Sequence, residues 1–190
     1  MLSKVSKIDP GNEGHYTLRV ATVSDADTLT RVGKETFSDT FAAMNTVENI
    51  EKYLNNTFTV DQLRKELNDP RCTFILLYEG KQVAGYAKLR KGDNDLNEVR
   101  KLEIERIYAG KQYIGKKAGK ALMQTCLDIA RRENYDAVWL GVWEHNVRAI
   151  AFYHSWGFKT VGAHPFWLGD DIQTDLVMEK KLNEDENSSL

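Results

Sequence analysis

Hydrophobic and polar residues follow strand-like patterns in some segments of the chain and helix-like patterns in others. Alternation or short apolar runs predict strands at residues 16–21, 73–78, 82–90, 99–109, 137–143, 159–167 and 174–180. Helical spacing and capping residues predict helices from Ser24 to Val32, from Thr46, from Thr59, over 119–132, and from Asn146 to Gly157. This order predicts an α/β fold, in which a mixed sheet carries helices on both faces.

These elements fit a single domain. A chain of 190 residues has the size of one domain, which we place at residues 16–182. Residues 1–15 contain Pro10, Gly11 and Gly14 among scattered charges, and are expected to form a loose leader. Residues 183–190 are acidic and polar, and are expected to form a disordered tail.

Composition narrows the classes of function. The net charge of −2 supplies no general positive field, which disfavours nucleic acid as a partner. No apolar run approaches the roughly 18 residues of a membrane span and no signal-peptide core precedes Tyr16, so a cytoplasmic location without membrane attachment is expected. Cys72, Cys126 and the four histidines lack metal-ligand spacing, so no metal site is predicted.

The segment 103–120 carries the clearest chemical signal. An apolar strand leads into a loop with two glycines and several lysines, and a helix follows directly. Glycines let the backbone approach a ligand, while the free N–H groups and the dipole of a helix N-terminus attract anions. Lys116, Lys117 and Lys120 add full charges. The segment predicts a phosphate or pyrophosphate site, with an ordinary solvated strand-to-helix turn as the alternative.

The order of elements and two blocks of sequence resemble the GNAT superfamily of acetyl-CoA-dependent N-acetyltransferases. The blocks are the strand and loop at 102–120 and the run from 139 to 158, and the likeness extends over residues 16–182. Segments 36–41, 102–108 and 173–180 are most similar to bacterial spermidine/spermine N-acetyltransferases. The resemblance implies a mostly antiparallel central sheet flanked by helices on both faces, and acetyl-CoA as the co-substrate.

The resemblance also implies a pyrophosphate site. The family motif is Arg or Gln, two residues, Gly, one residue, then Gly or Ala. In the register that keeps Gly119, Ile114 takes the first position and Lys117 replaces the first glycine. A backbone cradle tolerates both changes, because side chains are not its main donors. The implied contacts are Ile114, Gly115, Lys116, Lys117, Ala118, Gly119 and Lys120.

Further positions follow from the same resemblance. The pantetheine arm is expected along the strand edge at Ile107, Tyr108 and Ala109, which requires this strand to splay from the strand at 137–143. Asn146 matches a position that contacts the cofactor, and Tyr153 matches the tyrosine that protonates the departing thiolate. Considered alone, Asn146 is equally a helix cap, and Tyr153 would be assigned to the buried core.

The acceptor amine needs a group that takes its proton. Glu103 and Glu105 lie two apart on a strand and so share a face, where they can hold a cationic amine. Glu105 is the preferred base, and the choice between the two stays open; a solvent-facing surface is the alternative for both. Further candidates for holding a cation are Phe166, Trp167, Asp170, Asp171, Glu35 and Asp39.

The predicted function is transfer of an acetyl group from acetyl-CoA to a primary amine by direct attack, with a polyamine such as spermidine or spermine as acceptor. The expected partner is therefore a small-molecule amine, and a homodimer is left open. One alternative is a protein or peptide amino-group acetyltransferase, and another is a non-catalytic CoA-binding sensor. Acceptor preference and release of the CoA thiol separate the three.

Overall fold

The computed structural model describes residues 16–92 and 99–182, so the predicted leader and tail lie outside the described residues. The strands are β1 (Tyr16–Val20), β2 (Cys72–Glu79), β3 (Gln82–Lys91), β4 (Lys101–Ala109), β5 (Ala137–Trp143), β6 (Lys159–Leu168) and β7 (Asp171–Lys181). The α-helices are α1 (Ala26–Phe41), α2 (Val47–Thr57), α3 (Val60–Asn68), α4 (Ala118–Arg132) and α5 (Val147–Ser155).

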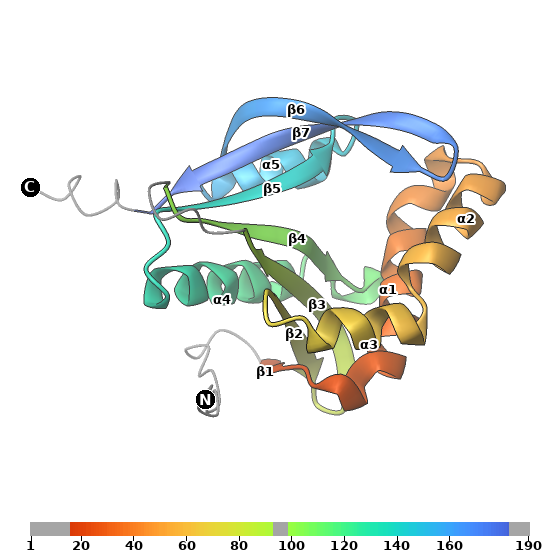
Figure 1. The fold of residues 1–190 in the computed structure, drawn as a ribbon, viewed down its shortest axis with the longest axis horizontal. Coiled ribbons are helices and arrows are strands. Elements are labelled where there is room, and N and C mark those ends of the chain that lie inside the picture. Colours follow the sequence, from red (N-terminus) through yellow and green to blue (C-terminus); the bar gives the residue numbers. More distant parts are fainter. Residues whose placement is uncertain (1–15, 93–98, 183–190) are drawn as a thin grey trace, which may run out of the picture.

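The strands form one seven-stranded sheet in the order β1-β2-β3-β4-β5-β7-β6. Neighbouring strands are antiparallel except β4 and β5, which run parallel. Helices α4 and α5 pack on one face, and α1, α2 and α3 pack on the other (Figure 1). The predicted fold, a mixed and mostly antiparallel sheet with helices on both faces, is confirmed.

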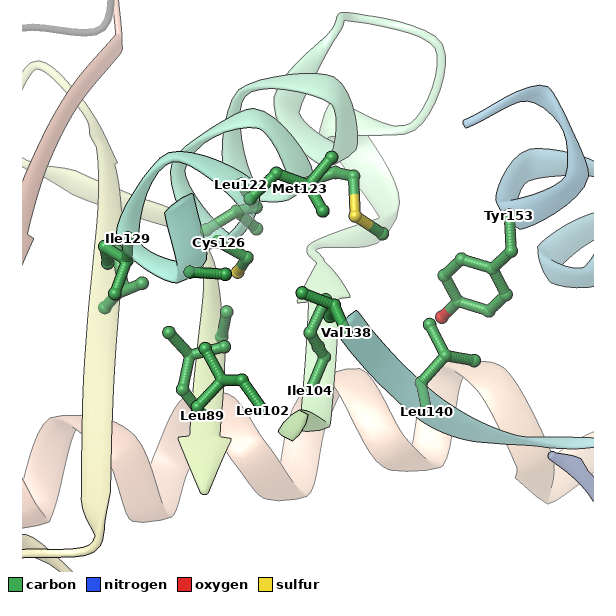
Figure 2. Close-up of a cluster of buried hydrophobic side chains, with 14 of the residues drawn as sticks. Leu89, Leu102, Ile104, Leu122, Met123, Cys126, Ile129, Val138, Leu140 and Tyr153 are labelled. Atoms are coloured by element: carbon green, nitrogen blue, oxygen red, sulfur yellow. The ribbon is translucent and has the colours of Figure 1, made fainter. Parts of the chain in front are cut away.

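Alternation along the strands builds an apolar core on each face. On β2, Ile75 and Leu77 enter the core beneath α4 and α5, whereas Phe74 and Leu76 enter the core beneath α1 to α3. Figure 2 shows the first core, where one face of α4, including Cys126, packs toward β3, β4 and β5. Each fully buried apolar side chain contributes about 1.5–3 kcal/mol, so these cores hold the helices against the sheet.

The first helix is longer than predicted. Its expected end at Val32 is wrong, because α1 continues through Gly33 to Phe41. A Cβ at Gly33 would lie 2.4 Å from the ring of Phe58, so the glycine makes room for that ring in the core. Burial of the ring offsets the roughly 0.5–1 kcal/mol that a helical glycine costs. The added turns carry Phe37 and Phe41 toward the end of the sheet at which β4 and β5 separate.

Strands β4 and β5 pair only where they begin. Parallel pairing joins residues 101–103 to 137–139 and then stops. Beyond this point β4 remains bonded to β3, and β5 remains bonded to β7, so a gap opens between them toward α1 (Figure 1). The splay expected between these strands is therefore present. It leaves the β5-facing backbone edge of residues 107–109 without a ladder partner.

Candidate active site

The gap between β4 and β5 opens into a cavity of about 810 Å³. The loop at 111–120 and the start of α5 line one end, while α1, α2, β6 and β7 line the other. Typical small-molecule sites have volumes of roughly 300–1,000 Å³, so this cavity can hold a ligand much larger than a simple amine. We therefore treat it as the candidate active site.

The loop before α4 presents a backbone cradle to this cavity. The Ala121 N–H donates to the Lys117 carbonyl, so the three preceding N–H groups have no partner inside the helix. Gly115 has φ 79°, and a Cβ there would meet nothing within 4 Å. This glycine is needed for its backbone conformation and leaves open space for a ligand. The cradle and the helix dipole together suit a pyrophosphate.

Lys117 replaces the glycine of the family motif and yet keeps the backbone that glycine favours. It caps α4 with φ 67°, in the left-handed region. That conformation costs a side-chain-bearing residue about 1–2 kcal/mol. The Lys117 side chain lines the cavity together with Lys111, Lys120 and Arg148, so the end of the cavity beside the loop is strongly positive. This charge suits the same anionic ligand.

Most of the residues predicted to contact the cofactor line the cavity: Ile107, Tyr108, Ala109, Ile114, Gly115, Lys117, Gly119, Lys120, Asn146 and Tyr153. Lys116 and Ala118 do not. The Lys116 ammonium lies over the ring of Tyr113, and its carbonyl accepts a hydrogen bond from the Tyr16 hydroxyl at 3.0 Å. Ala118 is fully buried. These two residues support the loop from behind.

Helix α5 places Asn146 and Tyr153 on the wall of the cavity. The Asn146 side chain accepts a hydrogen bond from the Ala149 N–H at 3.2 Å, so this residue caps the helix and also faces the ligand space. The Tyr153 hydroxyl points toward Leu140 of β5 (Figure 2). Burial raises the pKa of Tyr153 well above its usual value. The phenol is therefore protonated at neutral pH and can donate its proton.

Glu105 belongs to a buried ion cluster. It is the extra residue of a bulge in β4, since Ile104 pairs with Leu89 while Arg106 pairs with Lys88. The Glu105 carboxylate lies 2.6 Å from the Lys88 ammonium and 3.6 Å from the Arg106 guanidinium.

Glu66 of α3 completes the ion cluster. It lies 3.0 Å from both Lys88 and Arg106. The Lys88 side chain is 0% exposed, so these carboxylates replace the water that its charge has lost.

Glu103 has a different environment from Glu105. It does not line the cavity, but it lies close enough to Glu105 to feel its charge. Burial, followed by the charge of Glu105, raises the pKa of Glu103 above its usual value. Of the two predicted catalytic glutamates, Glu105 alone faces the ligand space.

The end of the cavity away from the lysine loop is aromatic. Tyr53 of α2 stacks on Phe37 with 4.3 Å between ring centroids, and it lies 5.6 Å from Phe166 of β6. Phe41 of α1 meets Trp143 of β5 at 6.1 Å, edge to face. All five rings line the cavity. The length of α1 beyond the predicted end supplies two of them.

Carboxylates accompany these rings. Asp39, Glu105 and Asp175 line the cavity, and aromatic faces together with carboxylates favour an organic cation. Several other predicted candidates for holding a cation lie elsewhere. Asp170 pairs with Lys52, Glu35 pairs with Arg31, and Trp167 is exposed; none of these, nor Asp171, lines the cavity.

Some residues of the cavity were not identified from the sequence. Arg106 directly precedes the apolar pair Ile107 and Tyr108, and Asp175 directly precedes the apolar run Leu176–Met178; a charge beside the apolar part of a strand is a detectable signal. Gly141 and Arg148 carry no comparable local signal. They face the cavity only because β5 and α5 meet there.

The described residues contain neither a group of metal ligands nor a membrane-spanning helix. Among residues 16–92 and 99–182, no group of three or more His, Cys, Asp or Glu side chains could hold a metal ion. In the same part of the chain, no helix is long and apolar enough to cross a membrane.

Comparison with known proteins identifies the family. Residues 37–158 match the Acetyltransferase (GNAT) family. The chain is 38% identical over 169 residues to an uncharacterized N-acetyltransferase in the pepI 3' region of Lactobacillus delbrueckii subsp. lactis, covering 87% of this chain and 98% of the relative. It is 26% identical over 168 residues to a spermidine N(1)-acetyltransferase of Thermoplasma acidophilum, covering 86% of this chain and 96% of that one.

Solved structures share the fold. The PaiA N-acetyltransferase of Thermoplasma acidophilum, crystallised with coenzyme A, superimposes with a TM-score of 0.74 at 24% identity, over 88% of this chain and 99% of that one. The family model covers more than half of the chain, and the Lactobacillus relative extends over nearly all of it. The chain therefore belongs to the GNAT family and is an acetyl-CoA-dependent N-acetyltransferase.

Proposed function

We propose that this enzyme acetylates a primary amine of a polyamine such as spermidine or spermine. The observation that carries the proposal is the division of the cavity into two unlike ends. One end offers lysines and a helix N-terminus, whereas the other offers aromatic rings and carboxylates. A polyamine places several positive charges along an apolar chain, and such a molecule suits the second end. The similarity to a spermidine acetyltransferase is consistent with this acceptor.

The chain's residues divide the work of the reaction. The residues at 114–120 and Asn146 hold the co-substrate, and the unpaired edge of 107–109 offers it main-chain hydrogen bonds. The aromatic end excludes water around the amine. Holding the two reactants together supplies much of the rate, because a thioester is already reactive.

The reaction requires one proton to leave the amine and another to reach the departing sulfur. The amine nitrogen bonds to the acetyl carbon and gives up one proton, while the carbon–sulfur bond breaks. Tyr153 donates its hydroxyl proton to the departing sulfur. Protons then exchange with solvent, so that the products are the N-acetylamine and the free thiol. Glu105 lines the aromatic end of the cavity, where its charge is balanced by Lys88 and Arg106 in the ion cluster.

The acceptor assignment is tested by CoA thiol release at saturating acetyl-CoA. We expect kcat/KM for spermine and spermidine to exceed that for butylamine and for glutamate. Added salt should raise the KM for spermine more than the KM for butylamine, because screening weakens several ion contacts at once. Equal efficiency on spermine and butylamine without a salt effect would exclude a polyamine acceptor. Absence of thiol release with every amine would instead favour a CoA-binding sensor.

A further inference from the structure

The carboxylates around the acceptor end differ in how their charges are balanced. Glu105 is held by Lys88 at 2.6 Å, by Arg90 at 3.3 Å and by Arg106 at 3.6 Å. If Glu105 took a proton, fully buried Lys88 would lose one of its two anionic partners, which is costly away from water. Glu105 is thus better suited to hold the ion cluster together than to accept a proton in every catalytic cycle.

Asp175 of β7 is the contrasting case. It pairs in register with Trp143 of β5, and its side chain lines the cavity. Within residues 16–92 and 99–182, no cation forms an ion pair with Asp175, and burial raises its pKa with only a partial offset from His164. An unpaired, partly desolvated carboxylate in a cavity is a suitable partner for an incoming ammonium.

His164 and Asp175 are register partners on β6 and β7, and both side chains lie beside Gly141 of β5. A Cβ on Gly141 would lie 3.3 Å from the Asp175 Oδ2 and also 3.3 Å from the His164 Nε2, so both groups border the same bare position on β5. The His164 Nδ1 is 3.0 Å from the Pro165 carbonyl, which can only accept a hydrogen bond. Nδ1 therefore carries a proton, and in the neutral ring Nε2 is free to accept another.

We propose that Asp175 binds the reacting ammonium of the acceptor and accepts its proton, and that His164 passes this proton to solvent; the inference rests on the proposed acetylation of an amine. The ammonium N–H bond breaks and its proton joins an Asp175 oxygen, which leaves the nitrogen lone pair free to attack the acetyl carbon. The proton then moves to the His164 Nε2 and from there to water. Asp175 is accordingly a catalytic residue, and His164 is a positioning and relay residue.

Other charged groups surround Asp175 and enter any pH profile. His164 faces it from β6, and Tyr53 of α2 is close enough to feel its charge. The charged side chains that line the same cavity from α1 and β4 are Asp39, Glu105 and Arg106. Apart from His164 itself, none of these groups is substituted in the variants proposed below, so a change in the profile is attributable to the substituted group.

The test is a set of pH profiles with spermidine and acetyl-CoA. Near pH 7, Asp175→Asn should lower kcat by about 10²-fold or more, while the Kd for acetyl-CoA measured by calorimetry stays within about twofold. The deficit should shrink as the pH approaches the amine pKa of about 10, because solvent then supplies the neutral amine. Asp175→Glu should recover part of the activity. His164→Gln should cost less, and adding it to Asp175→Asn should cost little more.

Matched variants separate a catalytic role from a structural one. Glu51 is exposed on α2 and does not line the cavity, so Glu51→Gln should leave kcat unchanged. A normal kcat in folded Asp175→Asn, or a deficit that does not change with pH, would overturn the inference. If the unsubstituted enzyme acetylates no amine at all, the proposed function fails instead, and this outcome is distinguishable from the first.

Discussion

The two ends of the cavity are built in different ways. The co-substrate end comes mainly from one continuous stretch, residues 107–120, together with the start of α5, and much of its chemistry resides in backbone groups. The acceptor end is assembled from α1, α2, β4, β5, β6 and β7, and its chemistry resides in side chains. The first can therefore tolerate changes of side chain, such as Lys117 in place of glycine, whereas the second depends on how distant elements pack.

This difference predicts where substitutions act. Changes in the loop should alter acetyl-CoA affinity and leave acceptor selection intact. Changes in the aromatic and acidic wall should alter acceptor kinetics or folding and leave acetyl-CoA affinity intact. Tyr153 lies on the wall of the cavity between the two ends, so its substitution should lower turnover without changing acetyl-CoA affinity.

The largest expected effect is that of Tyr153→Phe. The substitution keeps the ring and removes only the proton donor, so kcat should fall by about 10² to 10⁴-fold while the Kd for acetyl-CoA changes little. Steady-state kinetics and calorimetry on one preparation measure both quantities. Tyr135→Phe is the matched control, because Tyr135 is also buried but lies outside the cavity. Normal turnover in a folded Tyr153→Phe enzyme would assign this tyrosine to the core.

Lys88→Met should have the next largest effect, and it should act through the acceptor end. Removing the buried ammonium leaves Glu66 and Glu105 with less positive charge, which should lower the free energy of unfolding by about 3–5 kcal/mol. Urea unfolding measures this loss. Lys65 is exposed on the same α3 that carries Glu66, and Lys65→Met should change stability by about 0.5 kcal/mol or less. Equal stability of the two variants would mean that the ion cluster is not a structural support.

Gly115→Pro tests the co-substrate end. Proline cannot adopt φ 79° and removes a backbone donor, so acetyl-CoA affinity should fall by at least about tenfold, or roughly 1.4 kcal/mol. Gly80→Pro is the matched control, because it places proline at another glycine with positive φ (58°), in the turn between β2 and β3. This control should leave acetyl-CoA affinity unchanged. Unchanged affinity in a folded Gly115→Pro variant would mean that the loop does not hold the pyrophosphate.

The smallest expected effect concerns stability and pH. Because burial raises the pKa of Asp175, the folded state holds its proton more tightly. The associated stability is fully present below the usual pKa of 3.8 and is lost as the pH rises from 3.8 through the raised pKa of the folded state. Asp175→Asn should therefore be more stable than the unsubstituted protein at pH 7, by about 0.5–2 kcal/mol, and no more stable well below pH 3.8. Thermal or urea unfolding at both pH values measures the difference.

A partnered carboxylate should show the opposite sign. Arg19 lowers the pKa of Asp25 to about 2, so Asp25 adds stability above its usual pKa of 3.8, and this contribution disappears as the pH falls toward 2. Asp25→Asn should accordingly destabilise the protein at pH 7, by about 1–2 kcal/mol. If both substitutions destabilise at pH 7, Asp175 has a partner that the geometry does not reveal.

The same contrast explains what could be predicted from the sequence. The positions of the strands along the chain and the loop before α4 follow from local patterns, because strand alternation and the glycines near a helix start are features of neighbouring residues. The length of α1 could not be predicted in this way, since Gly33 is tolerated inside the helix only because Phe58, far along the chain, packs against it.

The residues of the acceptor end were harder to predict from the sequence for the same reason. Glu105 was correctly placed on the strand, but its cluster depends on Lys88 from β3 and Glu66 from α3, which come together only in the fold. Asp175 and His164 are paired between β7 and β6, and both lie beside Gly141 of β5. No local spacing links such residues, so their relationship appears only in the register of the sheet.

The central claim is that the acceptor end selects a polycation while the loop holds acetyl-CoA. The most direct test is a competition assay, in which acetyl-CoA is mixed with equal concentrations of spermidine, a neutral peptide with a free N-terminus, and glutamate, and the acetylated products are quantified by mass spectrometry. The account predicts that N-acetylspermidine predominates at low salt and that its share falls as salt is added. Predominance of the acetylated peptide at all salt concentrations would contradict it.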